Sequence, residues 1–390
     1  MTVYANKPAF NVREKLKELE KPSGVAGEAM LRADTPQEQF NLIGAGRRNL
    51  IFNGDMRIAQ RGTGAFTANG DRPVDRWQMI SNTNDFTTTQ DSTVPTGKGF
   101  TNSIKIQPTA TKSASGSTYA RIGYSIEGYD GAGLCWGTSG AKSATISFWV
   151  RASVIGIYSI GVKNGNANKS ICLEYTIDSA DTWEYKTITF PGVTDGTWAQ
   201  TNSRFCYIDV WQAGQGSQTS TIGVWQGQNV NMSSNQVNLF TSTSNTFYIT
   251  GFQMEVGKVA TPFEHRSYGE ELALCQRYYY RITNNYAVNQ NLCMGVVADT
   301  DDVFGVMDMP VTMRVPPSVT ASAAASFRVT TVFGSGSSQN CSQLMLGYDG
   351  QTHVTIKARG NGGGFTAGQA KLIGFNETIG LAYIEFDAEI

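Results

Sequence analysis

The sequence predicts a mainly β protein, and three observations lead to this expectation. From Asn49 onward, apolar and polar residues alternate with a period of two, as they do in half-buried strands. The chain holds 42 glycines but only 11 prolines, so turns are frequent while strands stay intact. Charged residues make up only 16% of the chain, which leaves Ser, Thr, Asn, Gln and Gly to supply its polarity.

The N-terminal segment, residues 1–47, is predicted to form a short helical anchor. The stretch Phe10–Glu20 places apolar residues at helical spacing and is stopped by Pro22. A helix this short is marginal alone in water, so its apolar stripe should be buried against its own copies or a docking protein. The residues expected to anchor or assemble the chain are Val12, Leu16, Leu19 and Phe40.

Residues 48–265 are predicted to form one large β-sandwich of eight to ten strands. Each expected strand alternates apolar and polar side chains and is bounded by clusters of Gly, Asn, Ser or Asp. The clearest ones are 147–151, 185–190, 204–210 and 247–252.

Residues 266–390 are predicted to form a second domain, a C-terminal β-sandwich that we call the knob. A short helical pattern over 268–280 opens it, and alternation then returns. The last expected strand is 381–390, so the C-terminus should be tied into a sheet.

Charge and hydropathy exclude several classes of protein. The formal net charge is -1, which gives no global attraction to nucleic acid. No stretch approaches the roughly 18 continuous apolar residues of a membrane span, and the N-terminus carries no apolar signal-peptide region. We therefore expect no nucleic-acid partner, no membrane insertion and no secretion by the usual route.

Metal and catalytic motifs are sparse. The six cysteines are scattered singly and only two histidines occur, which argues against a zinc site. Two sets of carboxylates are candidates for glycoside cleavage, which needs a pair across a sugar cleft. Asp71 and Asp75 flank a turn; Asp299, Asp301 and Asp302 form a run that a solvated loop, a cation site or a catalytic pair could explain. We expect no catalytic residues.

Tryptophans offer a binding interpretation and a structural one. Four of them stand beside Gly, Thr or Gln rather than in apolar runs, where exposed rings could stack on sugars. The alternative is packing in the sandwich core. These four are Trp136, Trp198, Trp211 and Trp225.

Several blocks resemble bacteriophage tail-fibre and related virion fibre proteins, and together they cover residues 49–390. The opening block NLIFNGDMRIAQRG at 49–62, followed by Asp75-Arg76-Trp77, is the most specific. The later blocks are 144–151 (ATISFWVR), 251–257, 260–264, 275–280, 309–314 and 316–320. The N-terminal segment is similar to the anchors of fibres from marine phages, especially cyanophages.

The sandwich also resembles the jelly-roll domains of carbohydrate-binding modules. Their first strand carries an Asn-Gly-Asp/Glu turn near a structural calcium. By this resemblance, Asp55 and Glu255 are the positions that would inherit the metal; no other cofactor is implied.

The fibre resemblance implies a homotrimer that docks to a phage tail adaptor, a nozzle or a capsid protein through residues 1–47. It implies a virion protein, made in the host cytoplasm, that adheres to a host-surface glycan or protein by stacking and neutral hydrogen bonds. The knob residues expected to meet the receptor are Tyr348, His353, Asn361 and Phe365. The alternatives are a capsid-attached head fibre or decoration protein and a polysaccharide depolymerase.

Overall fold

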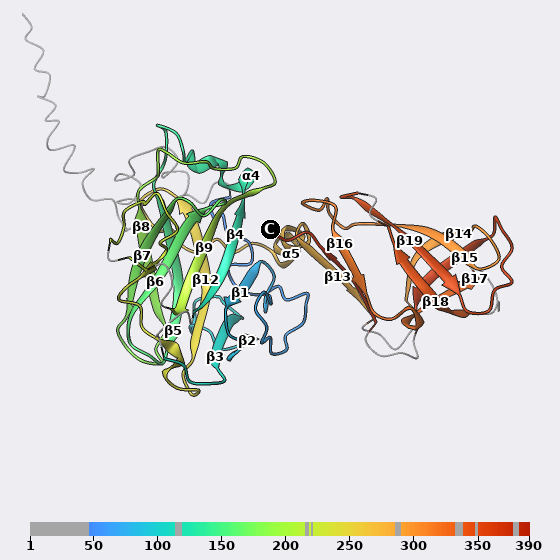
Figure 1. Cartoon of the computed structure of the whole chain (residues 1–390), viewed down its shortest axis with the longest axis horizontal. Helices are drawn as coiled ribbons and strands as arrows, with labels where there is room; N and C mark the ends of the chain where they lie inside the picture. The colour runs from blue at the N-terminus through green and yellow to red at the C-terminus, as the bar shows by residue number, and fades with distance from the viewer. Residues whose placement is uncertain are drawn as a thin grey trace, which may run out of the picture.

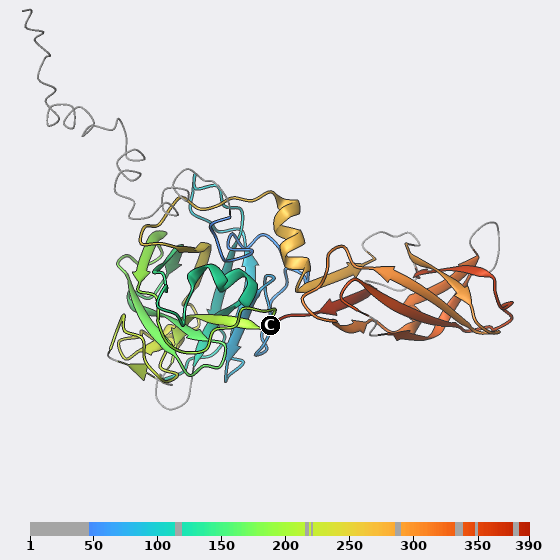
Figure 2. The ribbon, with the colours of Figure 1, turned by 90° about the horizontal axis from the view of Figure 1, so that it is seen from above.

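The computed structural model describes residues 47–113, 119–214, 218–219, 221–284, 290–331, 338–347, 350–376 and 382–390. In this part the chain is mainly β, as the alternating pattern predicted. Two β domains follow one another along the longest axis of the molecule, and helix α5 (Tyr268–Gln276) lies at their junction (Figure 1; Figure 2). The predicted anchor residues Val12, Leu16, Leu19 and Phe40 fall outside the described residues.

The N-terminal domain is a sandwich of two five-stranded antiparallel sheets, which confirms the expected eight to ten strands. We name each sheet by its central strand. The β9 sheet has the order β1 (Trp77–Ser81), β4 (Ala120–Glu127), β9 (Arg204–Ala213), β6 (Gly156–Asn164) and β7 (Ser170–Ile177). The β12 sheet has the order β2 (Phe86–Asp91), β3 (Ser103–Pro108), β12 (Phe247–Val256), β5 (Ala144–Ala152) and β8 (Glu184–Phe190).

The chain crosses repeatedly between these two sheets, as in a jelly-roll. Short elements complete the domain: α4 (Gly128–Gly131), 3-10 helices at Ala132–Leu134 and Leu239–Thr241, and the pair β10 (Gln218–Thr219) and β11 (Met232–Ser233).

Aromatic side chains join the two sheets across the core. The ring of Phe148 in β5 lies 5.0 Å from that of Tyr175 in β7 of the opposite sheet, and 5.4 Å from that of Phe252 in β12. Trp77 in β1 packs edge-on against Phe252 at 5.1 Å. Because large apolar rings from both sheets interdigitate, burial of apolar area is the main force that holds the sandwich together.

Helix α5 begins at an N-cap and ends before the predicted limit. The Ser267 side chain accepts a hydrogen bond from the Glu270 N–H at 3.2 Å, which satisfies one free donor of the first turn. The helix ends at Gln276, whereas the sequence pattern extended it to Tyr280. The reason is that Tyr279–Thr283 alternate as a strand, β13, and pair with β21 (Tyr383–Asp387).

The knob differs from the expected second sandwich. Strands β13, β21 and β16 (Ser318–Ala321) form a three-stranded sheet. Beyond it, six strands close into a barrel, which leaves no open sheet edge to pair with another chain. The barrel order is β14 (Asn291–Val297), β15 (Asp302–Asp308), β19 (His353–Gly360), β18 (Gln339–Leu346), β17 (Phe327–Thr331) and β20 (Ala370–Phe375); a 3-10 helix spans Ala324–Ser326.

Buried ion pairs join the knob to the sandwich. The Arg76 guanidinium of the sandwich donates to Glu389 near the C-terminus. Arg277, just after α5, pairs with Glu127 of β4 at 2.6 Å. Burial opposes ionisation of Glu389, but the surrounding arginines outweigh it and lower the pKa of this carboxyl. Charged groups buried with partners on the opposite domain hold the two domains in one arrangement.

Candidate functional site

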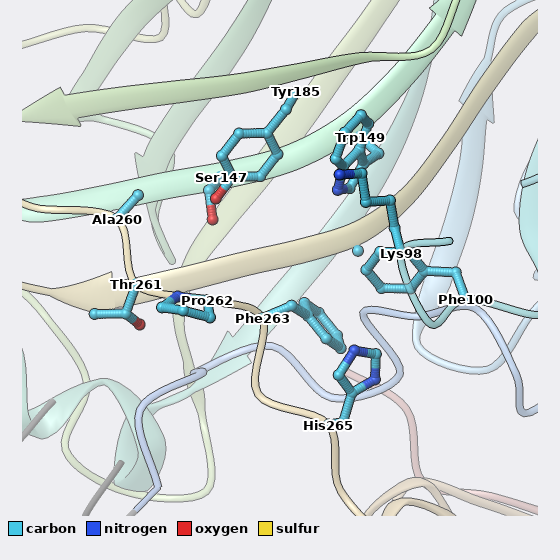
Figure 3. Close-up of a pocket in the computed structure, with 11 residues that line it drawn as sticks. Lys98, Phe100, Ser147, Trp149, Tyr185, Ala260, Thr261, Pro262, Phe263 and His265 are labelled. Atoms are coloured by element: carbon cyan, nitrogen blue, oxygen red, sulfur yellow. The ribbon is translucent and has the colours of Figure 1, made fainter. Parts of the chain in front are cut away.

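A hollow of about 430 Å³ lies on the outer face of the β12 sheet, on the side away from the core (Figure 3). Its walls come from strands β5, β8 and β12 and from two loops, residues 97–100 and 260–265. The lining residues are Lys98, Phe100, Ser147, Trp149, Tyr185, Gly251, Ala260, Thr261, Pro262, Phe263 and His265. We call this hollow the aromatic pocket.

Strand alternation determines which side chains form one wall of the aromatic pocket. In β5, Phe148 and Val150 point into the core, so Trp149 between them points outward. Tyr185 of β8 is the register partner of Trp149, and the two ring centroids are 5.3 Å apart. Tyr185 is 44% exposed, so its ring is available to a ligand.

The opposite wall is built by Phe100, Phe263 and His265. The rings of Phe100 and Phe263 meet edge to face at 5.1 Å, and the imidazole lies 4.9 Å from Phe263. Figure 3 shows this group facing Trp149 and Tyr185 across the hollow. Ring faces therefore flank the space from two sides.

A glycine in β12 makes room for Phe100. Gly251 has φ +62 and lies where the β12–β5 register shifts, a β-bulge. A Cβ atom at this position would approach Phe100 Cζ to 2.5 Å. Only glycine lets the phenylalanine ring cover the strand here, and the pocket wall depends on it.

Lys98 stands at the mouth of the aromatic pocket on a turn between two glycines. Gly97 and Gly99 have φ values of +72 and +81, a conformation that other residues rarely adopt. The ammonium lies 5.4 Å from the centre of the Trp149 ring, within the range of a cation–π contact. Figure 3 shows the Lys98 side chain reaching from Phe100 toward Trp149.

The floor of the pocket is fixed by a buried carboxylate. Glu255 accepts hydrogen bonds from the Thr261 N–H at 2.8 Å, the Thr261 hydroxyl at 2.7 Å and the Gln253 amide at 3.0 Å. These bonds hold the chain from Thr261 to Phe263 against β12. Both Glu255 oxygens are thereby occupied.

This arrangement does not fit the calcium that the family resemblance implied at Asp55 and Glu255. Asp55 is paired with Arg57, and Glu255 is used by Thr261 and Gln253. Calcium needs six to eight oxygen ligands. The described residues contain no group of three or more His, Cys, Asp and Glu side chains that could hold a metal. Asp55 and Glu255 act here as structural carboxylates.

The predicted knob residues do not form one site. His353 at the start of β19 and Asn361 after its end are exposed, and Tyr348 lies outside the described residues. Phe365 is only 8% exposed, so it does not lie on the knob surface where the sequence placed it. Its ring packs in the barrel core against Gly360, because that glycine leaves space for it.

The candidate carboxylates have structural partners. Asp71 accepts the backbone N–H groups of Thr67 and Ala68 in a turn. Asp75 is fully buried and accepts from the Gln60 N–H and amide. In the other set, Asp299 accepts backbone N–H bonds from Asp301 and Asp302. Asp302 itself is paired with Arg359 at 2.7 Å and with Lys357 at 2.8 Å.

Three of the four tryptophans considered for sugar stacking belong to the core. Trp136, Trp198 and Trp211 are 2%, 8% and 3% exposed. Trp136 and Trp198 pack with half-buried Trp225 in one aromatic cluster. The sequence interpretation missed Trp149 and Tyr185, although alternation within 144–152 and 184–190 put both rings on the outward face.

A second exposed apolar surface runs around the barrel of the knob. Register partners place Met345, Lys357, Phe304 and Val296 in one row across β18, β19, β15 and β14. Met294 and Val306 extend this row on β14 and β15. The barrel stripe, as we call it, comprises Met294, Val296, Phe304, Val306 and Met345, which are between 42% and 62% exposed.

Among the described residues, no helix has the length and hydropathy needed to cross a membrane.

Comparison with known protein families finds no match, and neither does comparison with curated proteins. Solved structures with a similar β fold exist. The enzymatically active domain of tailspike protein 4 from bacteriophage CBA120 has 13% identity and a TM-score of 0.31 over 53% of this chain and 21% of that one. The similarity thus spans about a fifth of the tailspike chain.

Two further similar structures contain CBM modules. TmCBM61, solved in complex with beta-1,4-galactotriose, has 11% identity and a TM-score of 0.29 over 54% of this chain and 99% of that one. The CBM22-1-CBM22-2 tandem domain of Paenibacillus barcinonensis Xyn10C has 10% identity and a TM-score of 0.28 over 89% of this chain and 99% of that one.

Proposed function

We propose that this chain is a fibre protein of a bacteriophage virion that adheres to a glycan on the host surface, and that the aromatic pocket is its sugar site. The observation that carries the proposal is the pair of aromatic walls, Trp149 with Tyr185 and Phe100 with Phe263. Sugar rings present apolar C–H faces that stack on such side chains, while a few polar groups set orientation. The volume of about 430 Å³ falls within the roughly 300–1,000 Å³ of small-molecule sites.

The assignment to a fibre is supported by the sequence blocks that resemble phage fibres. The opening block, Asn49–Gly62, builds the turn that receives α5. The Asn53 N–H donates to Glu271 of α5, and the Asn53 amide donates to the Ile58 carbonyl at 2.8 Å. The residues that carry the resemblance thus fasten the sandwich to the start of the knob.

Assembly into a homotrimer is part of this proposal, and the barrel stripe supports it. Contiguous exposed apolar patches on soluble proteins mark interaction surfaces. Lys357, the charged side chain in this row, is paired with Asp302. A second copy presents the same apolar surface, which makes it the partner with matching chemistry. Three chains would multiply a weak sugar contact into useful avidity.

Residues 1–47 would dock the fibre to a tail adaptor, a nozzle or a capsid protein, and the virion would be its place of action. We propose binding without cleavage. Within the described residues, no Asp or Glu is among the side chains that line the aromatic pocket. A glycoside hydrolase places two carboxyl groups across the scissile bond, and the pocket lining supplies neither.

The test is binding of oligosaccharides from bacterial surface polysaccharides to the full chain, measured by isothermal titration calorimetry. We expect Trp149→Ala to weaken binding about 30-fold, since a central buried ring contributes about 2 kcal/mol. The matched control is Trp183→Ala. Trp183 packs against Tyr248 with ring centroids 6.2 Å apart and does not line the pocket.

Equal loss of affinity in both variants would place the sugar elsewhere on the sheet, and no binding to any glycan would refute the proposed function. Release of reducing ends from a bound polysaccharide would make the protein a depolymerase instead.

A further inference from the structure

The charge of the aromatic pocket points to the class of sugar that it takes. Its lining contains one ammonium group, Lys98, and one imidazole, His265, and among the described residues it contains no carboxylate side chain. In the part of the chain that the structure describes, Lys98 has no ion pair with an acidic residue within 4 Å, although Lys163, Lys169, Lys186 and Lys357 all do. Lys98 is exposed at the pocket mouth.

Two described acidic groups next to the pocket lining already have partners. Glu264, between Phe263 and His265, accepts hydrogen bonds from the Arg48 and Asn49 N–H groups and from Arg266. Glu255 is fully buried beneath the floor, and its two oxygens accept hydrogen bonds from Thr261 and Gln253. It therefore offers no free oxygen to an incoming sugar hydroxyl. The positive charge of Lys98 is left facing the space between the aromatic walls.

Two hydroxyl groups of the pocket are already engaged in hydrogen bonds within its wall. Neutral sugars are held chiefly by side chains that accept from and donate to their hydroxyl groups. The Thr261 hydroxyl donates to Glu255 at 2.7 Å. The Ser147 hydroxyl bonds to the Tyr185 hydroxyl, which partly offsets the rise that burial causes in the Tyr185 pKa. Among the described lining residues, Lys98 and His265 are the basic side chains that can meet an incoming sugar.

The position of Lys98 is built into the backbone. Gly97 and Gly99 both adopt positive φ, and a Cβ atom on Gly99 would come within 3.2 Å of the His265 Nε2 atom. The turn thus packs directly on the imidazole. The ammonium and the imidazole reach the same hollow from neighbouring loops, as Figure 3 shows.

We propose that the aromatic pocket selects an anionic sugar, a ring that carries a carboxylate or a sulfate ester. The sugar face stacks on Trp149, and its anionic substituent pairs with Lys98, with His265 as a second N–H donor. This inference rests on the proposed function and narrows its substrate class. It also replaces the expectation that the receptor is held by neutral hydrogen bonds alone.

The test compares acidic oligosaccharides with neutral counterparts of the same backbone, using the full chain and calorimetry. The carboxylate arm uses oligogalacturonate, oligoglucuronate and oligomannuronate against their methyl esters. The sulfate arm uses sulfated against unsulfated galactose oligomers. Because an ion pair strengthens a hydrogen bond, we expect at least one acidic probe to bind about tenfold or more tighter than its neutral partner. This preference should shrink as salt is raised.

Variants attribute the preference to Lys98. Lys98→Gln should remove the tenfold difference by weakening binding of the acidic probe far more than binding of the neutral probe, while Lys98→Arg should keep the preference. The matched control is Lys105→Gln. Lys105 lies on the same outward face, with its ammonium 5.9 Å from the Tyr248 ring and outside the pocket lining.

Each outcome separates the two proposals. Equal affinity for acidic and neutral partners, or a preference that survives in Lys98→Gln, would overturn the anionic-sugar inference and leave the sugar site standing. Absence of binding to every acidic and neutral probe would overturn both. A preference in the carboxylate arm or the sulfate arm alone identifies the anion.

Discussion

The aromatic pocket and the barrel stripe both expose apolar side chains from alternating strands, yet they differ in what surrounds those side chains. On the sandwich, loops 97–100 and 260–265 rise beside β5 and β8 and turn a sheet face into a hollow. On the barrel, the row from Met345 to Val296 runs across four neighbouring strands of the closed wall. The first shape suits a small ring and the second suits another protein surface.

Period-two alternation therefore predicts which face of a sheet a side chain occupies but not what that face does. Trp149 and Val306 are both outward residues of β-strands. Glycines account for the difference between the surroundings of Trp149 and those of Val306. Gly251, Gly97 and Gly99 let loops and rings close in around Trp149.

The largest expected effect concerns the barrel stripe. Val306→Asp puts a charge on the stripe at a position that is 57% exposed. If other copies cover this surface, burial of an unpaired carboxylate should abolish self-association, and the mass by light scattering should fall from that of a trimer to that of a monomer. The aromatic pocket should keep its intrinsic affinity for a monovalent sugar.

The control for this variant is Ile155→Asp, because Ile155 is also 57% exposed but lies on the sandwich. It should leave the mass unchanged. A trimer that persists in Val306→Asp would show that the stripe is not the assembly surface, and a monomer in the unsubstituted chain would remove the homotrimer from the proposal.

The second effect concerns the glycine beneath the pocket. Gly251→Ala forces a Cβ to within 2.5 Å of Phe100 at a backbone φ of +62. We expect a loss of about 3 kcal/mol in the free energy of unfolding, from strain and displaced packing, together with weaker sugar binding. Urea titration and calorimetry measure the two effects. Gly133→Ala is the control, since a Cβ there meets nothing within 4 Å.

A third, smaller effect separates the two surfaces directly. Tyr185→Ala removes a partly exposed ring from the pocket wall and should lower sugar affinity about fivefold, by about 1 kcal/mol, without changing the mass in solution. Met345→Ala trims the edge of the barrel stripe and should weaken self-association while sugar affinity stays constant. The same response from both variants in either assay would contradict the separation of roles.

Much of the fold was predictable because alternation is a local property. The strands around Trp149, Tyr185, Phe205 and Phe252 were identified from their own residues. The barrel was not, because closure depends on which distant strands pair, as β14 does with β20. Phe365 was misplaced for a similar reason. A glycine-rich turn suggests a surface loop, but Gly360 in β19 provides the space that buries this ring.

The pocket was the least predictable part. Phe100, Trp149 and Phe263 are far apart in the sequence and meet only through the register of β12 with β5 and the bulge at Gly251. The outward position of Trp149 was available from the pattern. The residues that surround Trp149 in the pocket could not be predicted, since the conformation of their loops follows from glycine φ values and from the hydrogen bonds of Glu255.

The smallest expected effect is a difference in acid response between the two domains. Burial raises the pKa of Asp75 in the sandwich to about 6, against the opposing charge of Arg61. Between about pH 4 and pH 6 this carboxyl is protonated in the folded chain and ionised in the unfolded chain. The free energy of unfolding of the sandwich should therefore rise as pH falls from 7 to 5. In the barrel, the hydrogen bonds from Arg359 and Lys357 lower the pKa of Asp302, so its contribution is lost as pH falls below about 4.

Tryptophan fluorescence can follow the sandwich alone, because all seven tryptophans precede residue 266. Urea titrations at pH 7 and pH 5 should show a gain of about 1–2 kcal/mol in the sandwich, since one pKa unit corresponds to about 1.4 kcal/mol. Asp75→Asn should remove that gain, and Asp302→Asn should not.

For the barrel, hydrogen exchange in peptides from β15 and β19, corrected for intrinsic rates, should show protection falling between pH 5 and pH 3 unless Asp302 is replaced by Asn. If the free energy of unfolding of the sandwich falls from pH 7 to pH 5, Asp75 is ionised in the folded chain. The two domains would then differ in their exposed surfaces but not in their response to acid.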